Sequence, residues 1–192
     1  MHVFPEDAHL TFYPDGRYTW QLRSSEVAEV GRYPEDRPSY FIAAVGITLF
    51  VRGTVNGKVH VYSPQRIVIE SNLRYAADPR TATDADDYLG LVCDRNIEIA
   101  PPYVTGRGDL YIDAAIFARR RFLVTSIDYR RTATLYIYGS LTAGTLSATE
   151  PRYATKLEFD PRFDRARPPS FPSTNRYEVA SWEAAWSESA PP

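Results

Sequence analysis

Three consecutive arginines, Arg119, Arg120 and Arg121, are the first residues in this sequence whose chemistry suggests a binding role. Guanidinium groups bind phosphate and carboxylate through parallel hydrogen bonds. A repeat of short strands would place Arg95 beside these three residues, which predicts a basic ridge able to contact DNA, acidic polysaccharide or anionic lipid. Because the formal net charge is -2, we favour a simpler interpretation: a solvated corner whose arginines pair with local Asp and Glu.

Large apolar side chains precede the same corners. Tyr62, Val92, Phe117 and Tyr138 are predicted to point outward from successive repeats. An exposed stack of this kind is normally covered or functional. We expect the N-terminal hairpin or the C-terminal tail to cover it; the alternative is a partner-binding or ligand-stacking surface.

Acidic residues cluster in the segment TATDADDYLG, which carries Asp84, Asp86 and Asp87. Carboxylates at this spacing can contribute oxygen ligands to calcium, but the full spacing of a calcium loop is missing. Asp also forms turns at the start of strands. We therefore predict no metal and keep the three residues as weak candidates only.

No catalytic constellation is recognisable in the sequence. Asp113 with Arg119 or Glu98 would be the carboxylate and arginine of a polysaccharide-cleaving site, yet nothing in their spacing selects them. Cys93 is better explained as a small buried hydrophobe than as a nucleophile. We expect a protein that is not an enzyme and has no cofactor.

A repeat of short strands must position these side chains. The pattern apolar-x-small-x-x-x-apolar-x-apolar occurs at Val61/Ser63/Ile67/Ile69, Leu91/Cys93/Ile97/Ile99 and Ile116/Ala118/Phe122/Val124, with a degenerate copy at Leu135/Ile137/Gly139. Two strands that meet at a small inward corner residue are typical of a coil in a parallel β-solenoid. We predict an all-β, β-helix-like parallel β-solenoid of about four coils, with an antiparallel β-sandwich as the alternative.

Two turns bear directly on this prediction. Asn56-Gly57 has the composition of a tight hairpin, but the inward odd-numbered residues continue through it, from Val55 to Val59. A reversal would change that alternation, so we predict a bend within a coil. The hairpin is expected instead at 14–16, where Gly16 suits a left-handed position and Phe12 would face Tyr18.

The chain is expected to divide into three parts of one unit. Residues 1–40 form a hairpin and linker packed on the core, 41–160 the solenoid, and 161–192 a proline-rich wrapping tail. The tail ends in SWEAAWSES, where Ser181 would cap a short helix carrying Trp182 and Trp186. No signal peptide and no apolar stretch of about 18 residues is present, so this segment is not expected to insert into a membrane.

Three sequence segments carry a family resemblance: DDYLGLVCDRNIEIAPP, GDLYIDAAIFA, and FDPRF followed by PPSFP and a late Trp. Over residues 45–186 the chain resembles poorly characterised bacterial cell-envelope β-solenoid domains, found in large minor-pilin and PilX-like pilus-assembly proteins. The resemblance implies a surface or filament-associated structural role, with adhesion or DNA contact as further duties, and it defines no catalytic residues.

From this resemblance we expect a non-catalytic structural or adhesive module of a bacterial surface or pilus-type assembly. Its partners would be other subunits, polysaccharide or DNA, and a homo-oligomer is compatible with the role. A carbohydrate-binding or polysaccharide-cleaving solenoid is one alternative, and a DNA-binding pilus-tip module is another. The expected location is extracytoplasmic, which requires an export segment outside this sequence.

Overall fold

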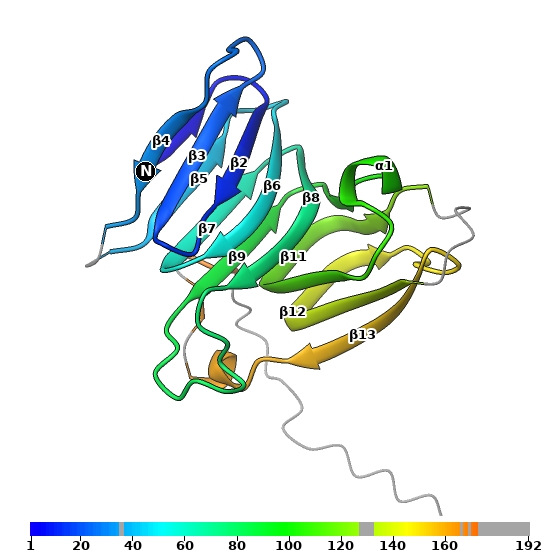
Figure 1. Ribbon diagram of the computed structural model, residues 1–192. Helices are drawn as coiled ribbons and strands as arrows, with labels where there is room; N and C mark the ends of the chain where they lie inside the picture. Colours follow the sequence, from blue (N-terminus) through cyan, green and yellow to red (C-terminus); the bar gives the residue numbers. More distant parts are fainter. Residues whose placement is uncertain (35–36, 127–132, 166, 169, 173–192) are drawn as a thin grey trace, which may run out of the picture.

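The computed structural model describes residues 1–34, 37–126, 133–165, 167–168 and 170–172, and shows an all-β chain (Figure 1). One thirteen-stranded sheet contains all the described strands. The strands are β1 (His2–Phe4), β2 (Ala8–Phe12), β3 (Arg17–Leu22), β4 (Glu29–Arg32), β5 (Ser39–Ala43), β6 (Thr48–Val55), β7 (Lys58–Ser63), β8 (Arg66–Tyr75), β9 (Tyr88–Cys93), β10 (Asn96–Ile99), β11 (Leu110–Val124), β12 (Ala133–Leu146) and β13 (Tyr153–Phe159). The helical segments are short: α1 (Pro102–Thr105) and the 3-10 turn η1 (Pro161–Asp164).

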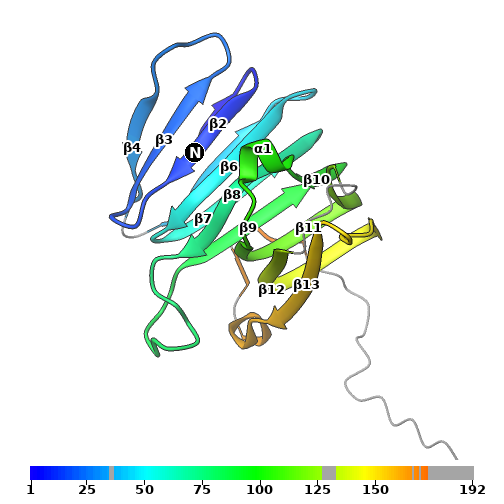
Figure 2. The same ribbon diagram turned by 45° about the vertical axis from the view of Figure 1, so that its right-hand side comes forward.

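The sheet is curled and mixed, as two views show (Figures 1 and 2). Its path runs β1-β5-β7-β9-β11 and returns through β10-β8-β6-β2-β3-β4, with β12 and then β13 added beside β11. Among the described strands, only the β2–β3 and β3–β4 pairs are antiparallel. The alternative of an antiparallel sandwich is therefore wrong.

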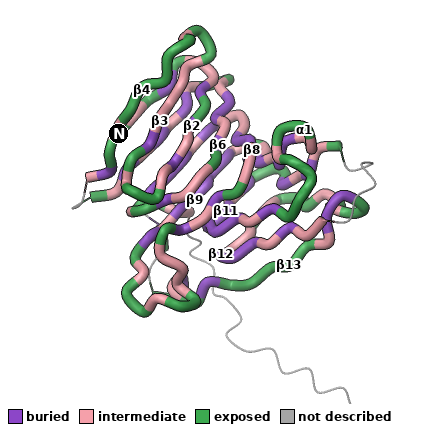
Figure 3. Tube along the Cα trace, in the orientation of Figure 1, coloured by how far each residue is buried: buried purple, intermediate pink, exposed green. Residues whose placement is uncertain are grey.

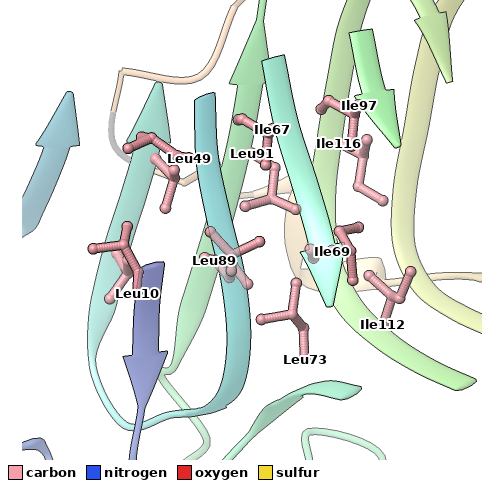
Figure 4. Close-up of a cluster of buried hydrophobic side chains, with 14 of the residues drawn as sticks. Leu10, Leu49, Ile67, Ile69, Leu73, Leu89, Leu91, Ile97, Ile112 and Ile116 are labelled. Atoms are coloured by element: carbon pink, nitrogen blue, oxygen red, sulfur yellow. The ribbon is translucent and has the colours of Figure 1, made fainter. Parts of the chain in front are cut away.

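Long strand β11 joins the two halves of the sheet. Ile112 near its start pairs with Leu73 of β8, its middle part pairs with β9 and its last part with β10. Its register with β12 shifts between Ala118 and Arg121. The two halves consequently face each other across one apolar core. Figure 4 shows part of this core, where Leu10, Leu49 and Ile67 lie in the same cluster as Leu91 and Ile116.

The three sequence repeats lie in parallel register, as predicted. Ser63 pairs with Cys93, and Cys93 pairs with Ala118. After the corner, Ile97 pairs with both Ile67 and Phe122. All these residues are buried.

The predicted position of the fourth repeat, with Gly139 as its corner residue, is wrong. Ala118 pairs with Ala143, whereas Gly139 pairs with Ala114, which precedes Ala118 in β11. Gly139 is required for close backbone contact, because a Cβ there would lie 2.0 Å from the Ala114 carbonyl oxygen, and its φ is 140°. Tyr138 consequently lies beside Asp113 and does not belong to the column of Tyr62.

Asn56-Gly57 is a bend, as predicted. Val55 pairs with Tyr75 and Lys58 with Tyr88, so β6 and β7 are not paired with each other. The turn is held by the Asp87 carboxylate, which accepts a hydrogen bond from the Gly57 backbone N–H at 2.6 Å. At the equivalent place between β8 and β9, the chain has the 12-residue segment 76–87 instead of a two-residue bend.

The N-terminal hairpin is confirmed in detail. Phe12 faces Tyr18 across β2 and β3, and Gly16 has a φ of 80°. The linker expected to follow this hairpin within residues 1–40, however, contains β4, which pairs with β3. Gly31 in β4 makes this possible, because a Cβ there would meet the Tyr18 ring at 2.4 Å.

Beyond β13, the chain turns through η1 and crosses the outer side of the β9 and β11 strands. Asp160, which is fully buried, binds the Arg162 guanidinium at 2.7 Å, and Arg162 also donates to the Ala85 carbonyl oxygen at 2.9 Å. The predicted capping helix at Ser181 lies outside the described residues. In the part of the chain that the structure describes, no helix is long and apolar enough to cross a bilayer.

Candidate functional site

The predicted arginine ridge is assembled at the corner between the two halves of the sheet. We call Arg95, Arg119, Arg120 and Arg121 the arginine corner. The backbone N–H groups of Arg120 and Arg121 both donate to the Arg95 carbonyl oxygen, at 3.0 and 3.1 Å. This shared acceptor fixes the bulge of β11 against the turn between β9 and β10.

Strand β12 packs tightly on the same bulge. A Cβ at Gly144 would lie 2.5 Å from the Arg119 carbonyl oxygen, so only glycine allows this approach. A hollow of about 440 Å³ remains at the corner. It is lined by Asn96, Arg119, Arg120, Arg121, Gly144 and Thr145.

All four side chains of the arginine corner are exposed. Within the described ranges, none of them lies within 4.0 Å of a carboxylate oxygen, whereas neighbouring Arg66 is paired with Glu98 at 3.7 Å. The expectation that these arginines pair with local acids is therefore wrong for the described part of the chain. Positive charges that lack local partners can hold an external anion.

The carboxylate next to the corner in sequence is already engaged. Asp94 accepts a hydrogen bond from the Tyr62 hydroxyl at 2.7 Å. This bond stabilises the neutral phenol and raises the pKa of Tyr62 to about 12. Asp94 is thus held by Tyr62 on the outer face of the sheet.

The outward column is partly covered by the C-terminal tail, as expected. Tyr62 pairs with Val92, and Val92 with Phe117. The Phe171 ring packs edge-on against Phe117, with ring centroids 6.4 Å apart. Pro168 lies against Gly90, and a Cβ added at Gly90 would be 3.1 Å from the Pro168 Cβ.

A groove of about 580 Å³ remains between the tail and the sheet. Phe117, Phe159, Phe163 and Phe171 all line it. Phe117 and Phe171 are half-buried, and Phe163 is 8% exposed, so much of this aromatic surface is already packed.

A second aromatic group, which the sequence did not reveal, lies on the outer face of β11 and β12. The Tyr111 and Tyr136 rings stack at 4.7 Å, nearly parallel. Arg74 lies over Tyr111 at 4.8 Å and Lys156 over Tyr136 at 5.3 Å. Because both faces of each ring are occupied, this stack does not offer a free platform for a sugar.

Tyr138 belongs to this second group. Arg80 covers its ring at 4.7 Å. The ring is 4% exposed, and burial raises the pKa of Tyr138 to about 12. Of the three aromatic residues predicted to form a binding surface, only Tyr62 and Phe117 share a column.

Asp113 is buried on the same face, and its carboxylate accepts from Arg74 Nε at 2.9 Å and from the Tyr75 backbone N–H at 3.2 Å. Burial raises the pKa of Asp113, and the Arg74 charge opposes that shift. The other imagined catalytic partner, Glu98, is paired with Arg66. The structure therefore joins Asp113 to neither Arg119 nor Glu98.

The three aspartates of the weak metal hypothesis serve separate local contacts. Asp87 binds backbone N–H groups of Gly57 and Ala77, Asp86 pairs with Lys58 at 3.4 Å, and Asp84 is exposed. Among the described residues, no group of three or more His, Cys, Asp or Glu side chains is arranged to hold a metal ion.

The lone cysteine is a core residue, as expected. Cys93 is fully buried, and burial raises the pKa of its thiol to about 11. Comparisons with protein-family models, curated proteins and solved structures gave no match.

Proposed function

We propose that the chain is a non-catalytic structural and adhesive module of a bacterial surface or pilus-type assembly, located outside the cytoplasm, and that its adhesive surface is the arginine corner. The observation that carries the proposal is the group of four exposed guanidinium groups without a described carboxylate partner. The ligand class is a polymer with closely spaced anionic groups, either phosphodiesters or uronic acid carboxylates.

The architecture supports this role. Parallel columns through β7, β9 and β11 are the arrangement expected of solenoid coils, and they bring the turn that carries Arg95 beside Arg121 of β11. Strands in a sheet are about 4.8 Å apart, so the corner presents charge at a spacing that a flexible anionic chain can follow. A neutral glycan is less suited, since the stacked Tyr111 and Tyr136 rings have no free face.

The test measures binding to duplex DNA, to polygalacturonate and to a neutral glucan over a salt series. For wild type, we expect binding to an anionic polymer that weakens as salt increases. Replacing Arg119, Arg120 and Arg121 together with Gln should lower affinity at least tenfold near 0.1 M salt. For DNA it should also reduce the salt slope by about 3, because each phosphate contact contributes about 0.9.

A matched control separates the corner from net charge. Arg23, Arg37 and Arg107 are exposed residues on other surfaces, and their joint replacement with Gln removes the same charge. The control should bind like wild type. Equal losses in both triple variants, or no binding by wild type to either anionic polymer, would contradict the proposal.

A further inference from the structure

Strand β13, the last strand of the sheet, has an open edge. It pairs only with β12 among the described strands, so its other edge presents unpaired backbone N–H and C=O groups. Its residues from Thr155 to Phe159 are largely in the exposed colour of Figure 3. An open edge of this length is a template on which another strand can pair.

Leu157 of β13 continues a core column of the sheet. Leu157 pairs with Ile137, and Phe159 pairs with Gly139, both inward positions in β12. Yet Leu157 is 58% exposed and Phe159 is 52% exposed. A neighbouring strand would bury Leu157 on the face that already packs against the core. Phe159, at the end of the strand, lies edge-on to Phe163 and lines the groove under the tail.

The described chain itself leads away from this edge. Directly after Phe159, the buried Asp160–Arg162 pair and the bond from Arg162 to Ala85 turn the chain through η1. The described residues between 167 and 172 then lie on the outer face near Tyr40 and Phe117. No segment of the described part of the chain therefore covers this edge.

The order of charges in β13 is complementary to an antiparallel second copy of the same strand. Side chains directly opposite in an antiparallel pair share a face, so only registers centred on a residue of β13 match inward to inward. Centring on Lys156 opposes two lysines, and centring on Glu158 opposes two glutamates. Centring on Leu157 instead places Lys156 opposite Glu158 twice.

We infer that two copies of the chain dimerise by antiparallel pairing of their β13 strands about a two-fold axis at Leu157. In this register Leu157 contacts its own counterpart, and Phe159 lies opposite Thr155. Two reciprocal Lys156–Glu158 pairs form on the outer face. A lysine on an edge strand disfavours pairing with unrelated strands, whereas a strand with the complementary order of charges can pair.

The test measures the monomer–dimer equilibrium of the full chain by sedimentation velocity over a concentration series. Wild type should dimerise. Lys156→Glu and Glu158→Lys should each raise the dimer dissociation constant about tenfold, because two attractive pairs become repulsive. The double variant should return to within about threefold of wild type. Its recovery cannot come from the Lys156–Tyr136 contact, which the swap removes.

Two controls sharpen this test. Lys58→Glu changes the net charge equally at a site away from β13 and should leave dimerisation unchanged. Leu157→Cys should form an intermolecular disulfide, because directly opposite Cα atoms lie about 4.5–5.5 Å apart. Thr155→Cys should not, since its counterpart would be about 13 Å along the strand.

Three results would overturn the inference. Wild type could remain monomeric at all concentrations, which would point to residues 173–192 or another protein as the cover. It could form open-ended oligomers, which would indicate head-to-tail stacking. It could dimerise equally well in the charge variants, which would place the interface on another surface.

Discussion

At the N-terminal end of the sheet, aromatic side chains from both halves close over the core, whereas at the C-terminal end the core columns stop at an open strand. Tyr18 in β3 packs edge-on against Phe41 in β5 at 4.9 Å, and its hydroxyl bonds His2 in β1 at 2.7 Å. At the other end, Leu157 and Phe159 are more than half exposed. Within its described residues, the chain therefore completes one end of its core and leaves the other end open.

Removing one phenylalanine at each end tests this contrast with the largest expected effect. Phe12→Ala should cost about 3–5 kcal/mol, because Phe12 is 2% exposed and contacts Tyr33 and Phe41. Phe159→Ala should cost about 1 kcal/mol or less at concentrations where the chain is monomeric. Chemical denaturation gives both free energies of unfolding, and equal losses would contradict the contrast between the two ends.

The repeat was predictable from sequence because its columns depend on local alternation. The small residues Ser63, Cys93 and Ala118 and their apolar neighbours occupy the predicted parallel register. Gly139 was misplaced because two different needs select a small residue: a corner side chain that must fit inside, and a backbone that approaches another strand. Only the three-dimensional register shows that Ala143 meets the first need and Gly139 the second.

The arginine corner was only half predictable. Its position is a consequence of the repeat, since Arg95 and Arg121 flank equivalent corners. The absence of described acidic partners depends on which other residues bind the carboxylates of the sheet. Tyr62 binds Asp94, and Arg74 binds Asp113. The open edge at β13 was likewise hidden, because the exposure of Leu157 depends on which segments pack beside it in space.

A second pair of variants tests whether the backbone is packed equally tightly at the closed N-terminal end and at the open C-terminal end. Gly53 lies near the N-terminal end, where an added Cβ would be 2.1 Å from the Phe12 carbonyl oxygen, and Gly139 makes the equivalent contact with Ala114. Each change to Ala should cost about 1–3 kcal/mol more than Gly46→Ala.

Gly46 is the matched control because its φ is also positive, at 86°, while nothing lies within 4 Å of the added Cβ. Thermal and chemical denaturation provide the comparison. A loss for Gly139→Ala no larger than that for Gly46→Ala would mean that β12 can move away from β11. The C-terminal end would then be loosely packed in its backbone as well as open at its edge.

The smallest expected effect is a pH dependence confined to the closed end. Burial, together with the charge of the nearby amino terminus, holds the pKa of His2 below its usual value, and Glu29 opposes this shift. The unfolded chain, with an ordinary histidine pKa near 6.5, therefore binds more protons than the folded chain just below that pH. Stability should fall as pH decreases from about 7 to about 5.

The variant His2→Phe keeps an aromatic ring against Phe41, with which His2 stacks at 5.5 Å, and removes the titrating group. Its melting temperature should be lower than that of wild type at pH 7, because the bond to the Tyr18 hydroxyl is lost. It should also change less between pH 7 and pH 5. Identical pH slopes in the two proteins would show that His2 does not titrate differently on folding. The hydrogen bond to Tyr18 would then contribute to closing the N-terminal end equally at every pH in this range.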